Sequence, residues 1–456
     1  MSTENLKKYS NSLKSWLGKN IIDCNLKAKP ITLEECKEWE LRDGFIQHSS
    51  GRFFSVAGFR LKSNRISSSF SEQPIIDQPE IGILGFLVKI IDNEWHWLLQ
   101  AKAEPGNVNG VQAAPTVQAT KSNYERVHNG LPTPFLEYFT KPGASQATLE
   151  TDIEQSEQGD RFFNKYNQNC VSITSDHSKE SLDSVYKWFS AKELRSGLLE
   201  NYTINTDARS VILCADWNKI ADWGLAPFEK WANQQDFGRL LFYSLNTDHS
   251  LLEWSDVLQR IEEERNRVEL ETSRIPLTEL QNWVLHDDRI LSKVGDYSPF
   301  QVQFYEVQVR NREVNSWCQP LFRNTRKTNI SLICSNFSGT LHFYFRLATE
   351  PGFKNSVQLA PSVIDDPQHR KIDWCSHALA HPKTQRHASV LQSDEGGRFM
   401  HSIANYCIYE VDSGFADIHD KEGVWLTLHQ IKELTQMKGY LTNETRSALS
   451  ILLAWA

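Results

Sequence analysis

The sequence has no long apolar run and no closely spaced cysteines. None of its apolar stretches approaches the roughly 18 residues that span a membrane, and its N-terminal segment lacks the apolar core of a signal peptide. The eight cysteines are scattered and form no Cys-x-x-Cys pair. In a chain of 456 residues this pattern favours reduced thiols over a disulfide framework. We therefore expect a cytoplasmic protein that is neither secreted nor embedded in a membrane.

Motifs that hold common cofactors and metals are also missing. The sequence contains no G-x-x-x-x-G-K-[ST], no G-x-G-x-x-G, no H-E-x-x-H and no G-x-S-x-G. These absences argue against a P-loop and against a nicotinamide or flavin held in a Rossmann unit. We expect neither a cofactor nor a bound metal.

Positive charge is in deficit, since 49 Lys and Arg residues stand against 57 Asp and Glu residues, a formal net charge of −8. This balance argues against attraction of the whole molecule to nucleic acid or to an anionic membrane. An anionic ligand would need local Arg and Lys side chains. Hydrophobic residues make up 40% of the chain and charged residues 23%, which is ordinary for a globular protein of two or three domains.

What the sequence does contain is an internal duplication. The stretch AKAEPGNVNGVQAAPTV has a counterpart in LATEPGFKNSVQLAPSV, at an offset of 246 residues (350 − 104). Further on, QSEQGDRFFNKYNQNC matches QSDEGGRFMHSIANYC at an offset of 237 residues (392 − 155). We therefore predict two related units, residues 31–215 and 277–456, together with an N-terminal extension at 1–30 and a helical connector at 216–276.

Both units have the same expected order of elements. A short helix (31–42 and 277–285) precedes extended runs such as EIGILGFLVKII and ISLICSNF, which are rich in strand-forming residues. Each unit ends in amphipathic helices, SAKELRSGLLE and LTLHQIKELTQM. Strands bounded by helices predict an α+β domain twice over. In the connector we expect Ser255 and Asp256 to cap a solvated helix, which is also a candidate dimer contact.

The repeated Glu-Pro-Gly sequence has two interpretations. Pro removes a ladder donor and Gly permits a turn, so the strand ends sharply and leaves the carboxylate of Glu104 at its end, where small-molecule sites are often built. Alternatively, Glu104 accepts backbone or Arg hydrogen bonds and only fixes the turn. The presence of the sequence in both units favours this structural role.

The following segment, VQAAPTVQATKSNYERVHNG, is polar at every second or fourth position. On a strand the residues at these positions would share a face, and such a face needs water or a ligand. They are Gln112, Thr116, Gln118, Thr120, Ser122 and Tyr124. Further ionisable and hydrogen-bonding groups nearby are Lys102, Glu104, Asn107, Asn123, Tyr124, Arg126 and His128. We predict a ligand site here, and a poorer one in the second unit, where the segment reads VQLAPSVIDDPQHRKIDW.

The second repeated motif places Arg161 and Arg398 at corresponding positions. Either guanidinium could make a bidentate hydrogen bond to a phosphate or carboxylate of a ligand. The alternative is an internal ion pair with Glu. The aromatic residues Phe162, Phe399 and Trp317 are expected to serve the core rather than to stack on a base.

The stretches QPIIDQPEIGILGF, QAKAEPGNVNGVQAAPTVQATKSNYERVH, QSEQGDRFF and NTDARSVILC, with WCQPL and EGGRF later, resemble the NDP-hexose 2,3-dehydratases over nearly the whole chain. The resemblance implies an α/β (α+β) chain, a tandem duplication of a Nudix-hydrolase-like α/β/α domain with mixed sheets. It also implies a homodimer that acts on a dTDP-linked 4-keto-6-deoxyhexose in deoxysugar biosynthesis. The Nudix metal-binding motif has no clear match, so pyrophosphate hydrolysis is not expected.

That reaction needs a base, an acid and an oxyanion donor. A base removes the C3 hydrogen, donors stabilise the enolate, and an acid assists departure of the C2 hydroxyl, giving a 3,4-diketo-2,6-dideoxy sugar. Glu104 or His128 is the expected base and Tyr124 the expected acid. The expected substrate-binding residues are Lys102, Asn107, Gln118, Thr120, Asn123, Arg126 and Arg161, with Gln73, Trp317, Glu350 and Arg398 in a second pocket. The rival interpretations are a non-catalytic nucleotide-sugar-binding protein and a metal-dependent nucleotide pyrophosphohydrolase.

Overall fold

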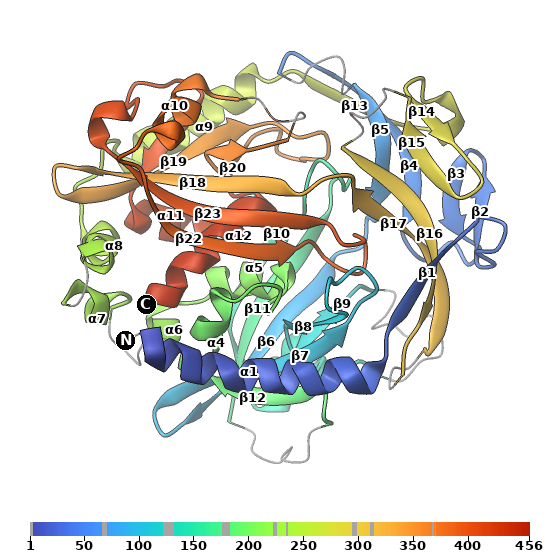
Figure 1. Ribbon diagram of the computed structural model, residues 1–456, viewed down its shortest axis with the longest axis horizontal. Coiled ribbons are helices and arrows are strands. Elements are labelled where there is room, and N and C mark those ends of the chain that lie inside the picture. The colour runs from blue at the N-terminus through green and yellow to red at the C-terminus, as the bar shows by residue number, and fades with distance from the viewer. Residues whose placement is uncertain are drawn as a thin grey trace.

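Four β-sheets and the helices around them form the molecule in a computed structural model (Figure 1). The structure describes residues 3–65, 71–121, 132–175, 183–221, 226–233, 236–293, 299–310, 314–366, 369 and 371–456. Within these residues each half of the chain contributes one small sheet and one large sheet. The halves are similar, as the duplication predicts.

The two large sheets share one topology. In the first, the order is β10 (Ala147–Ser156), β11 (Tyr166–Thr174), β6 (Gly82–Ile91), β7 (Glu94–Ala103) and β12 (Tyr186–Ser190), with β8 (Val111–Ala114) on β7 and β9 (Val117–Ala119) on β6. In the second, the order is β22 (Gln385–Ser393), β23 (Ile403–Val411), β18 (Thr328–Phe337), β19 (Thr340–Ala348) and β24 (Gly423–Leu426), with β20 (Gln358–Ala360) on β19 and β21 (Val363–Ile364) on β18. Only β11–β6 and β23–β18 are parallel among these described pairs, so both sheets are mixed. The α+β class is confirmed, whereas the relationship to Nudix hydrolases stays a prediction.

The two small sheets exchange their leading strands. The first consists of β2 (Trp39–Arg42), β3 (Phe45–His48), β4 (Ser55–Ser63) and β5 (Glu72–Asp77), and the second of β14 (Trp283–Leu285), β15 (Arg289–Ser292), β16 (Phe300–Gln308) and β17 (Ser316–Asn324). Strand β1 (Lys27–Ile31) pairs with β16, and β13 (Leu270–Ile275) pairs with β4 (Figure 1). The strand that precedes each half therefore completes the small sheet of the other half.

The predicted short helices at 31–42 and 277–285 are wrong. Residues 39–42 form β2 and residues 283–285 form β14, with one turn of 3₁₀ helix between β13 and β14. Trp39 packs on Phe54 at 4.8 Å and Trp283 on Phe300 at 4.9 Å between ring centroids, so each Trp joins its edge strand to the small-sheet core. The turn Asp43-Gly44, with φ of 52° and 82°, is a hairpin signal that the prediction overlooked.

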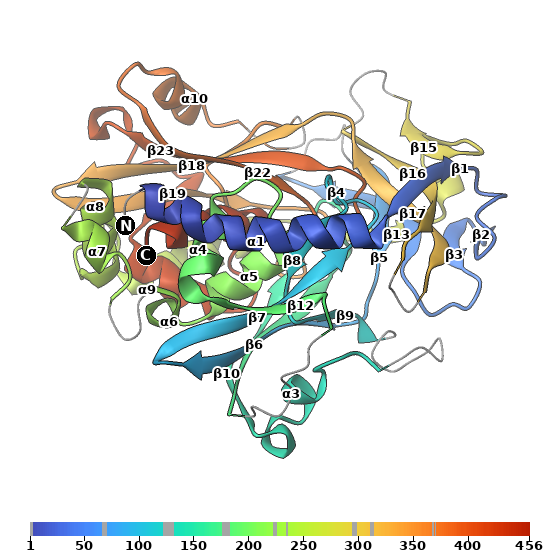
Figure 2. The same ribbon diagram turned by 60° about the horizontal axis from the view of Figure 1, so that its bottom comes forward.

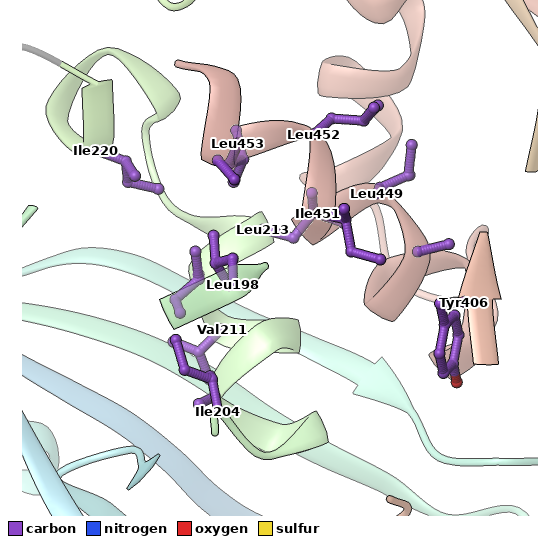
Figure 3. Close-up of a cluster of buried hydrophobic side chains, with 14 of the residues drawn as sticks. Leu198, Ile204, Val211, Leu213, Ile220, Tyr406, Leu449, Ile451, Leu452 and Leu453 are labelled. Atoms are coloured by element: carbon purple, nitrogen blue, oxygen red, sulfur yellow. The ribbon is translucent and has the colours of Figure 1, made fainter. Parts of the chain in front are cut away.

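Helices α4 (Ala191–Leu198) and α5 (Thr206–Cys214) in the first half correspond to α11 (Leu428–Thr435) and α12 (Asn443–Leu452) in the second. Both α4 and α11 begin with a capping box, formed by Ser190 and Glu193 and by Thr427 and Gln430. Helices α5 and α12 pack against each other, and Figure 3 shows apolar side chains of both halves, such as Leu213 and Ile451, gathered in this region. One hydrophobic core thus runs through both halves.

The N-terminal helix α1 (Thr3–Cys24) packs on α4, β7 and β8 and leads into β1 beside β16 (Figure 2). The connector holds α6 (Trp217–Ala221), α7 (Glu229–Ala232), α8 (Asp236–Asn246) and α9 (Trp254–Arg267). The predicted cap at Ser255 and Asp256 is wrong, because α9 begins at Trp254 and Glu253 occupies the N-cap position without a side-chain cap. Short helices α3 (Glu137–Thr140) and α10 (Asp373–Ala380) cover the outer faces of the large sheets. In the described residues no helix has the length and hydropathy needed to cross a membrane.

Candidate active site

Each Glu-Pro-Gly turn is docked on the other half of the chain. The backbone nitrogen of Gly106 donates to the carbonyl oxygen of Gly396 at 2.8 Å. The nitrogen of Gly352 donates to the carbonyl oxygen of Gly159 at 2.6 Å. The Glu-Pro-Gly turn of each half therefore lies against the second repeated motif of the other half, the one that holds Gly159 or Gly396. A polar cluster forms at each of these two contacts.

Glu104 is the centre of the first of these clusters. It follows β7 and is 4% exposed, and the amide of Gln118 donates to its Oε1 at 3.0 Å. Asn205 donates to Oε1 of Gln118 at 3.0 Å and caps α5 by accepting from the nitrogen of Ala208. The ammonium of Lys102 donates to the Gln118 carbonyl at 3.2 Å. A chain of amides thus fixes the Glu104 carboxylate relative to the start of α5.

The second half supplies a guanidinium to this cluster. Arg398 donates to Oε1 of Gln78 from two nitrogens, at 3.2 and 3.3 Å, and its guanidinium carbon lies 4.2 Å from the ring centre of Phe54. Burial lowers the pKa of Arg398, while Glu395 and Glu104 oppose that shift. The cation is therefore held by first-half residues and faces carboxylates of both halves.

Further buried ionisable groups complete the first cluster. Its ionisable members are Lys102, Glu104, Glu157, Lys165, Asp207, Glu395 and Arg398. Burial and the nearby carboxylates of Glu395 and Glu157 raise the pKa of Asp207 well above its ordinary range. Burial lowers the pKa of Lys165 to about 8 against the pull of Glu157 and Glu395. Carboxyl groups and an ammonium group of shifted pKa within one buried cluster are typical of acid–base sites.

The corresponding second cluster is built around Glu350. Its ionisable members are Asp160, Arg161, Arg346, Glu350, Asp394 and Glu444. Burial, together with Glu444 and Asp160, raises the pKa of Glu350 well above its ordinary range. Burial raises the pKa values of Asp394 and Glu444 to about 7.

The two clusters differ in the groups that could bind a developing negative charge. At the offsets of the duplication, Lys102 corresponds to Ala348, Lys165 to Ser402 and Gln118 to Ile364. The second cluster therefore lacks both ammonium groups and the amide that holds Glu104. It has Arg346 instead, whose Nε donates to the carbonyl of Pro361. The first cluster is the better equipped for chemistry that forms an oxyanion.

Most predicted residues of the first site for which the structure gives a position do meet. Lys102, Glu104 and Gln118 are brought together as above. Asn107 joins them, since its Nδ2 donates to the Lys102 carbonyl at 3.3 Å, and its Oδ1 is buried with no partner among the described residues. Thr120 lies beside Gly82 at the end of β9. The predicted residues Asn123, Tyr124, Arg126 and His128 lie outside the described residues.

The predicted second pocket is partly wrong. Arg398 was expected there with Glu350, yet it lies with Glu104, because the motifs dock crosswise between the halves. Trp317 also belongs on this side: it donates to Gln319, whose amide donates to the carbonyl of Gly397. Gln73 lies with the second cluster, and so does Arg161, which was not predicted for the second pocket. Gln73 donates to the Asp160 carbonyl at 2.5 Å, and Arg161 pairs with the Asp160 carboxylate at 2.7 Å. The predicted alternative of an Arg–Glu pair is thus replaced by an Arg–Asp pair.

The shared polar face predicted for Gln112, Thr116, Gln118 and Thr120 is also wrong. Pro115 interrupts the segment, so β8 and β9 pair with different strands. The Thr116 hydroxyl accepts from Leu87 and donates to Leu98, both backbone groups of the sheet. Gln112 donates to the hydroxyl of Ser393 at 2.7 Å. Thr116 and Gln112 therefore hold the fold together, whereas Gln118 donates to Glu104.

The sequence prediction missed four members of the first cluster, namely Glu157, Lys165, Asp207 and Glu395. A signal did exist for Asp207, since the duplication places Glu444 at its counterpart, so both α5 and α12 carry an acid in the first turn. Among the residues that the structure describes, no three His, Cys, Asp or Glu side chains are grouped to hold a metal ion.

Comparison with known proteins agrees with the duplicated architecture. The family model for NDP-hexose 2,3-dehydratase matches residues 10–215 and 254–452, one region for each half. A dTDP-4-dehydro-6-deoxy-alpha-D-glucopyranose 2,3-dehydratase of Saccharopolyspora spinosa is 32% identical over 452 residues, covering 97% of this chain and 91% of that protein.

Two further relatives bear the same name. The protein of Amycolatopsis orientalis is 30% identical over 474 residues, covering 100% of this chain and 92% of its own length. The protein of Streptomyces violaceoruber is 31% identical over 414 residues, covering 89% and 88%. With a family model matched in both halves and relatives matched along nearly their whole length, the chain belongs to the NDP-hexose 2,3-dehydratase family, whose members are sugar-nucleotide hydro-lyases.

Proposed function

We propose that this protein removes water across C2 and C3 of a dTDP-linked 4-keto-6-deoxyhexose, as a step of deoxysugar biosynthesis. The product would be a 3,4-diketo-2,6-dideoxy sugar nucleotide. The names of the three relatives support the substrate class, since each is a 2,3-dehydratase of a dTDP-4-dehydro-6-deoxy sugar. The observation that carries the proposal is the buried Glu104 carboxylate, oriented by Gln118 and facing cations from both halves.

The first cluster supplies groups for the first step. The 4-keto group acidifies the hydrogen on C3, and Glu104 takes that proton as the general base. Gln118 holds one oxygen of Glu104, so the orientation of the carboxylate is set before substrate binds. Negative charge then develops on the C4 oxygen, where Lys102 or Arg398 would stabilise the enolate electrostatically. His128 as an alternative base and Tyr124 as the acid stay predictions.

Substrate binding would use the remaining polar groups near this cluster. Asn107 has a buried amide oxygen with no partner in the described chain, and a sugar hydroxyl would satisfy it. Thr120, Asn123 and Arg126, predicted from the same segment, would hold the sugar and the diphosphate. Arg161, Gln73 and Glu350 would belong to the second cluster, and Trp317 would support the Arg398 loop through Gln319.

The function is tested with purified protein and a dTDP-4-keto-6-deoxyglucose, without added metal or nicotinamide. The expected result is loss of one water from the sugar nucleotide, detected by mass after a ketoreductase traps the product. Tight binding without a change in mass would contradict the proposal and favour a binding protein. Release of nucleoside monophosphate that EDTA abolishes would instead favour a pyrophosphohydrolase.

We also propose that the enzyme works as a homodimer in the cytoplasm. The family resemblance supports the dimer, and all eight cysteines are free thiols, as expected of a reducing compartment. Light scattering of the purified protein should give about twice the chain mass of 52.5 kDa. A mass equal to that of one chain at working concentration would contradict the dimer.

A further inference from the structure

The elimination needs a proton donor for the C2 oxygen, and a buried carboxyl group of the first cluster, that of Asp207, is the candidate considered next to Glu104. Asp207 is in the first turn of α5, two residues after the N-cap Asn205. It is 2% exposed. Because Asn205 bonds to Gln118 and Gln118 bonds to Glu104, the backbone of Asp207 is fixed relative to the proposed base.

Polar neighbours of Asp207 on α5 hold the two halves together. Thr206 donates to Asn443 at 3.0 Å, Arg209 donates to Ser450 at 3.1 Å, and Ser210 accepts from Arg446 at 2.8 Å. By contrast, no hydrogen bond to the Asp207 carboxyl is found among the described residues. Buried polar groups in proteins are normally hydrogen-bonded, so a buried carboxyl without a partner points to a ligand that supplies one.

A second unpartnered atom lies in the same cluster. The Oδ1 of Asn107 is buried without a partner in the described chain, while its amide nitrogen bonds to the backbone of Lys102. Asn107 also contacts the loop of Glu395, because a β-carbon added at Gly396 would lie 2.4 Å from its Oδ1. Asn107 and Asp207 thus leave an acceptor and a carboxyl group unsatisfied within one buried polar cluster, as a site for a polyhydroxylated ligand would.

The charges around Asp207 set its protonation state. The carboxylates of Glu395, Glu157 and Glu104, in decreasing order of effect, raise the pKa of Asp207. Lys102 lowers this pKa, and Arg398 interacts with the same carboxyl. Burial is the largest cause of the rise, and it favours the neutral form of the carboxyl. Two carboxyl groups in different surroundings, one oriented by an amide and one whose pKa is raised, are suited to act as base and acid.

We propose that Asp207 is the proton donor of the elimination, a role that rests on the function proposed above. Glu104 takes the C3 proton, and the enolate electron pair forms the C2–C3 double bond as the C2–O bond breaks. The C2 oxygen leaves as water with the proton of Asp207. In the tautomerisation that follows, C2 gains the proton held by Glu104 and the 3-hydroxyl gives its proton to Asp207, so both groups return to their starting states.

The test separates proton removal at C3 from loss of water. Wild type, Asp207→Asn, Glu104→Gln and Tyr124→Phe are incubated with the 4-keto sugar nucleotide in D2O, and both C3 exchange and dehydration are measured. We expect Asp207→Asn to dehydrate about 10²-fold more slowly or worse, while C3 deuteration continues at a rate within a few-fold of wild type. Glu104→Gln should lose both. The control is Asp256→Asn, the same change at an exposed position in the first turn of α9, which should change neither rate.

Three outcomes would overturn the assignment. The first is an Asp207→Asn variant that dehydrates the sugar as fast as wild type. The second is an Asp207→Asn variant that loses C3 exchange and dehydration equally. The third is that Tyr124→Phe, and not Asp207→Asn, exchanges C3 without dehydrating the sugar. If Asp207→Asn does not fold, Asp207→Glu replaces it and should slow dehydration more than exchange. Wild type that fails to dehydrate the sugar would refute the proposed function itself, and it would do so whatever the variants show.

Discussion

The α-carbon of Gly106 lies so close to the backbone of Phe399 that an added β-carbon would be 1.6 Å from the Phe399 carbonyl oxygen. Gly352 has the same relationship to Phe162, at 1.7 Å. The glycine of each Glu-Pro-Gly turn is therefore required by an approach between backbones of the two halves, not by the turn alone. The repeated sequence is in both halves because the docking is reciprocal, and this leaves the carboxylates of Glu104 and Glu350 open to different uses.

Gly106→Ala and Gly352→Ala should both destabilise the protein. Each methyl group would meet a backbone oxygen that cannot move without displacing the opposite motif, so we expect about 3 kcal/mol or more to be lost from the free energy of unfolding. Denaturant unfolding measures the effect. Gly18→Ala is the control, because Gly18 is in α1 with open space around it and alanine there should stabilise by about 0.5–1 kcal/mol. Variants at 106 and 352 as stable as wild type would refute the reciprocal docking.

Glu104→Gln and Glu350→Gln should differ sharply in activity. The first change removes the proposed base, and turnover should fall by about 10²-fold or more. The second should change turnover little, because burial raises the pKa of Glu350 and favours its neutral acid, which glutamine replaces by a neutral amide of similar shape. Steady-state rates with circular dichroism as the folding control provide the comparison. Equal losses in the two variants would mean that both residues only stabilise the turns.

The sequence predicted the elements better than it predicted their contacts. The duplication and the strands of the large sheets follow from local composition and periodicity, which depend on near neighbours. An offset between repeats says which residues correspond but not which residues touch. Arg398 was therefore assigned to Glu350, its neighbour in the same half, although crosswise docking places it with Glu104. Asp207 was missed because an acid in the first turn of a helix has an ordinary explanation in the helix dipole.

The second cluster should make stability depend on pH. The pKa of Asp394 is about 7 in the folded state, raised by burial and by Glu444 and Asp160, whereas an unfolded Asp has a pKa of about 4. Between about pH 4 and pH 7, Asp394 therefore keeps its proton in the folded protein and loses it in the unfolded chain. Stability from this group is fully present below about pH 4 and is lost as pH rises through about 7. The pKa of Glu444 is raised in the same direction.

Asp394→Asn removes one of these titrations. The melting temperature of wild type should fall between pH 5 and pH 8, and the fall should be smaller in the variant, by on the order of 1–2 °C. Scanning calorimetry across this range measures it, with Asp256→Asn as an exposed control that should leave the slope unchanged. A variant with the same pH dependence as wild type would show that Asp394 does not titrate in this window.

The exchange of leading strands predicts how the chain can be divided. A cut in the segment between α8 and α9 gives fragments 1–250 and 251–456, which separates β13 from β4 and β1 from β16. Each fragment alone would expose an unpaired strand edge and the apolar faces of α5 or α12, so we expect both to aggregate when expressed singly. Expressed together, they should form a one-to-one complex with the dehydratase activity of the intact chain.

A second cut provides the matched control. Fragment 1–276 keeps β13 and so restores the edge of β4, which should make it more soluble than fragment 1–250, although both lack α12. Deleting residues 1–31 from the intact chain should instead uncover β16 in the second half and leave β4 paired. Hydrogen exchange would then rise in β16 rather than in β4. A soluble monomeric fragment 1–250 with native-like circular dichroism would contradict the exchange of strands between the halves. It would show that the first half needs no strand from the second.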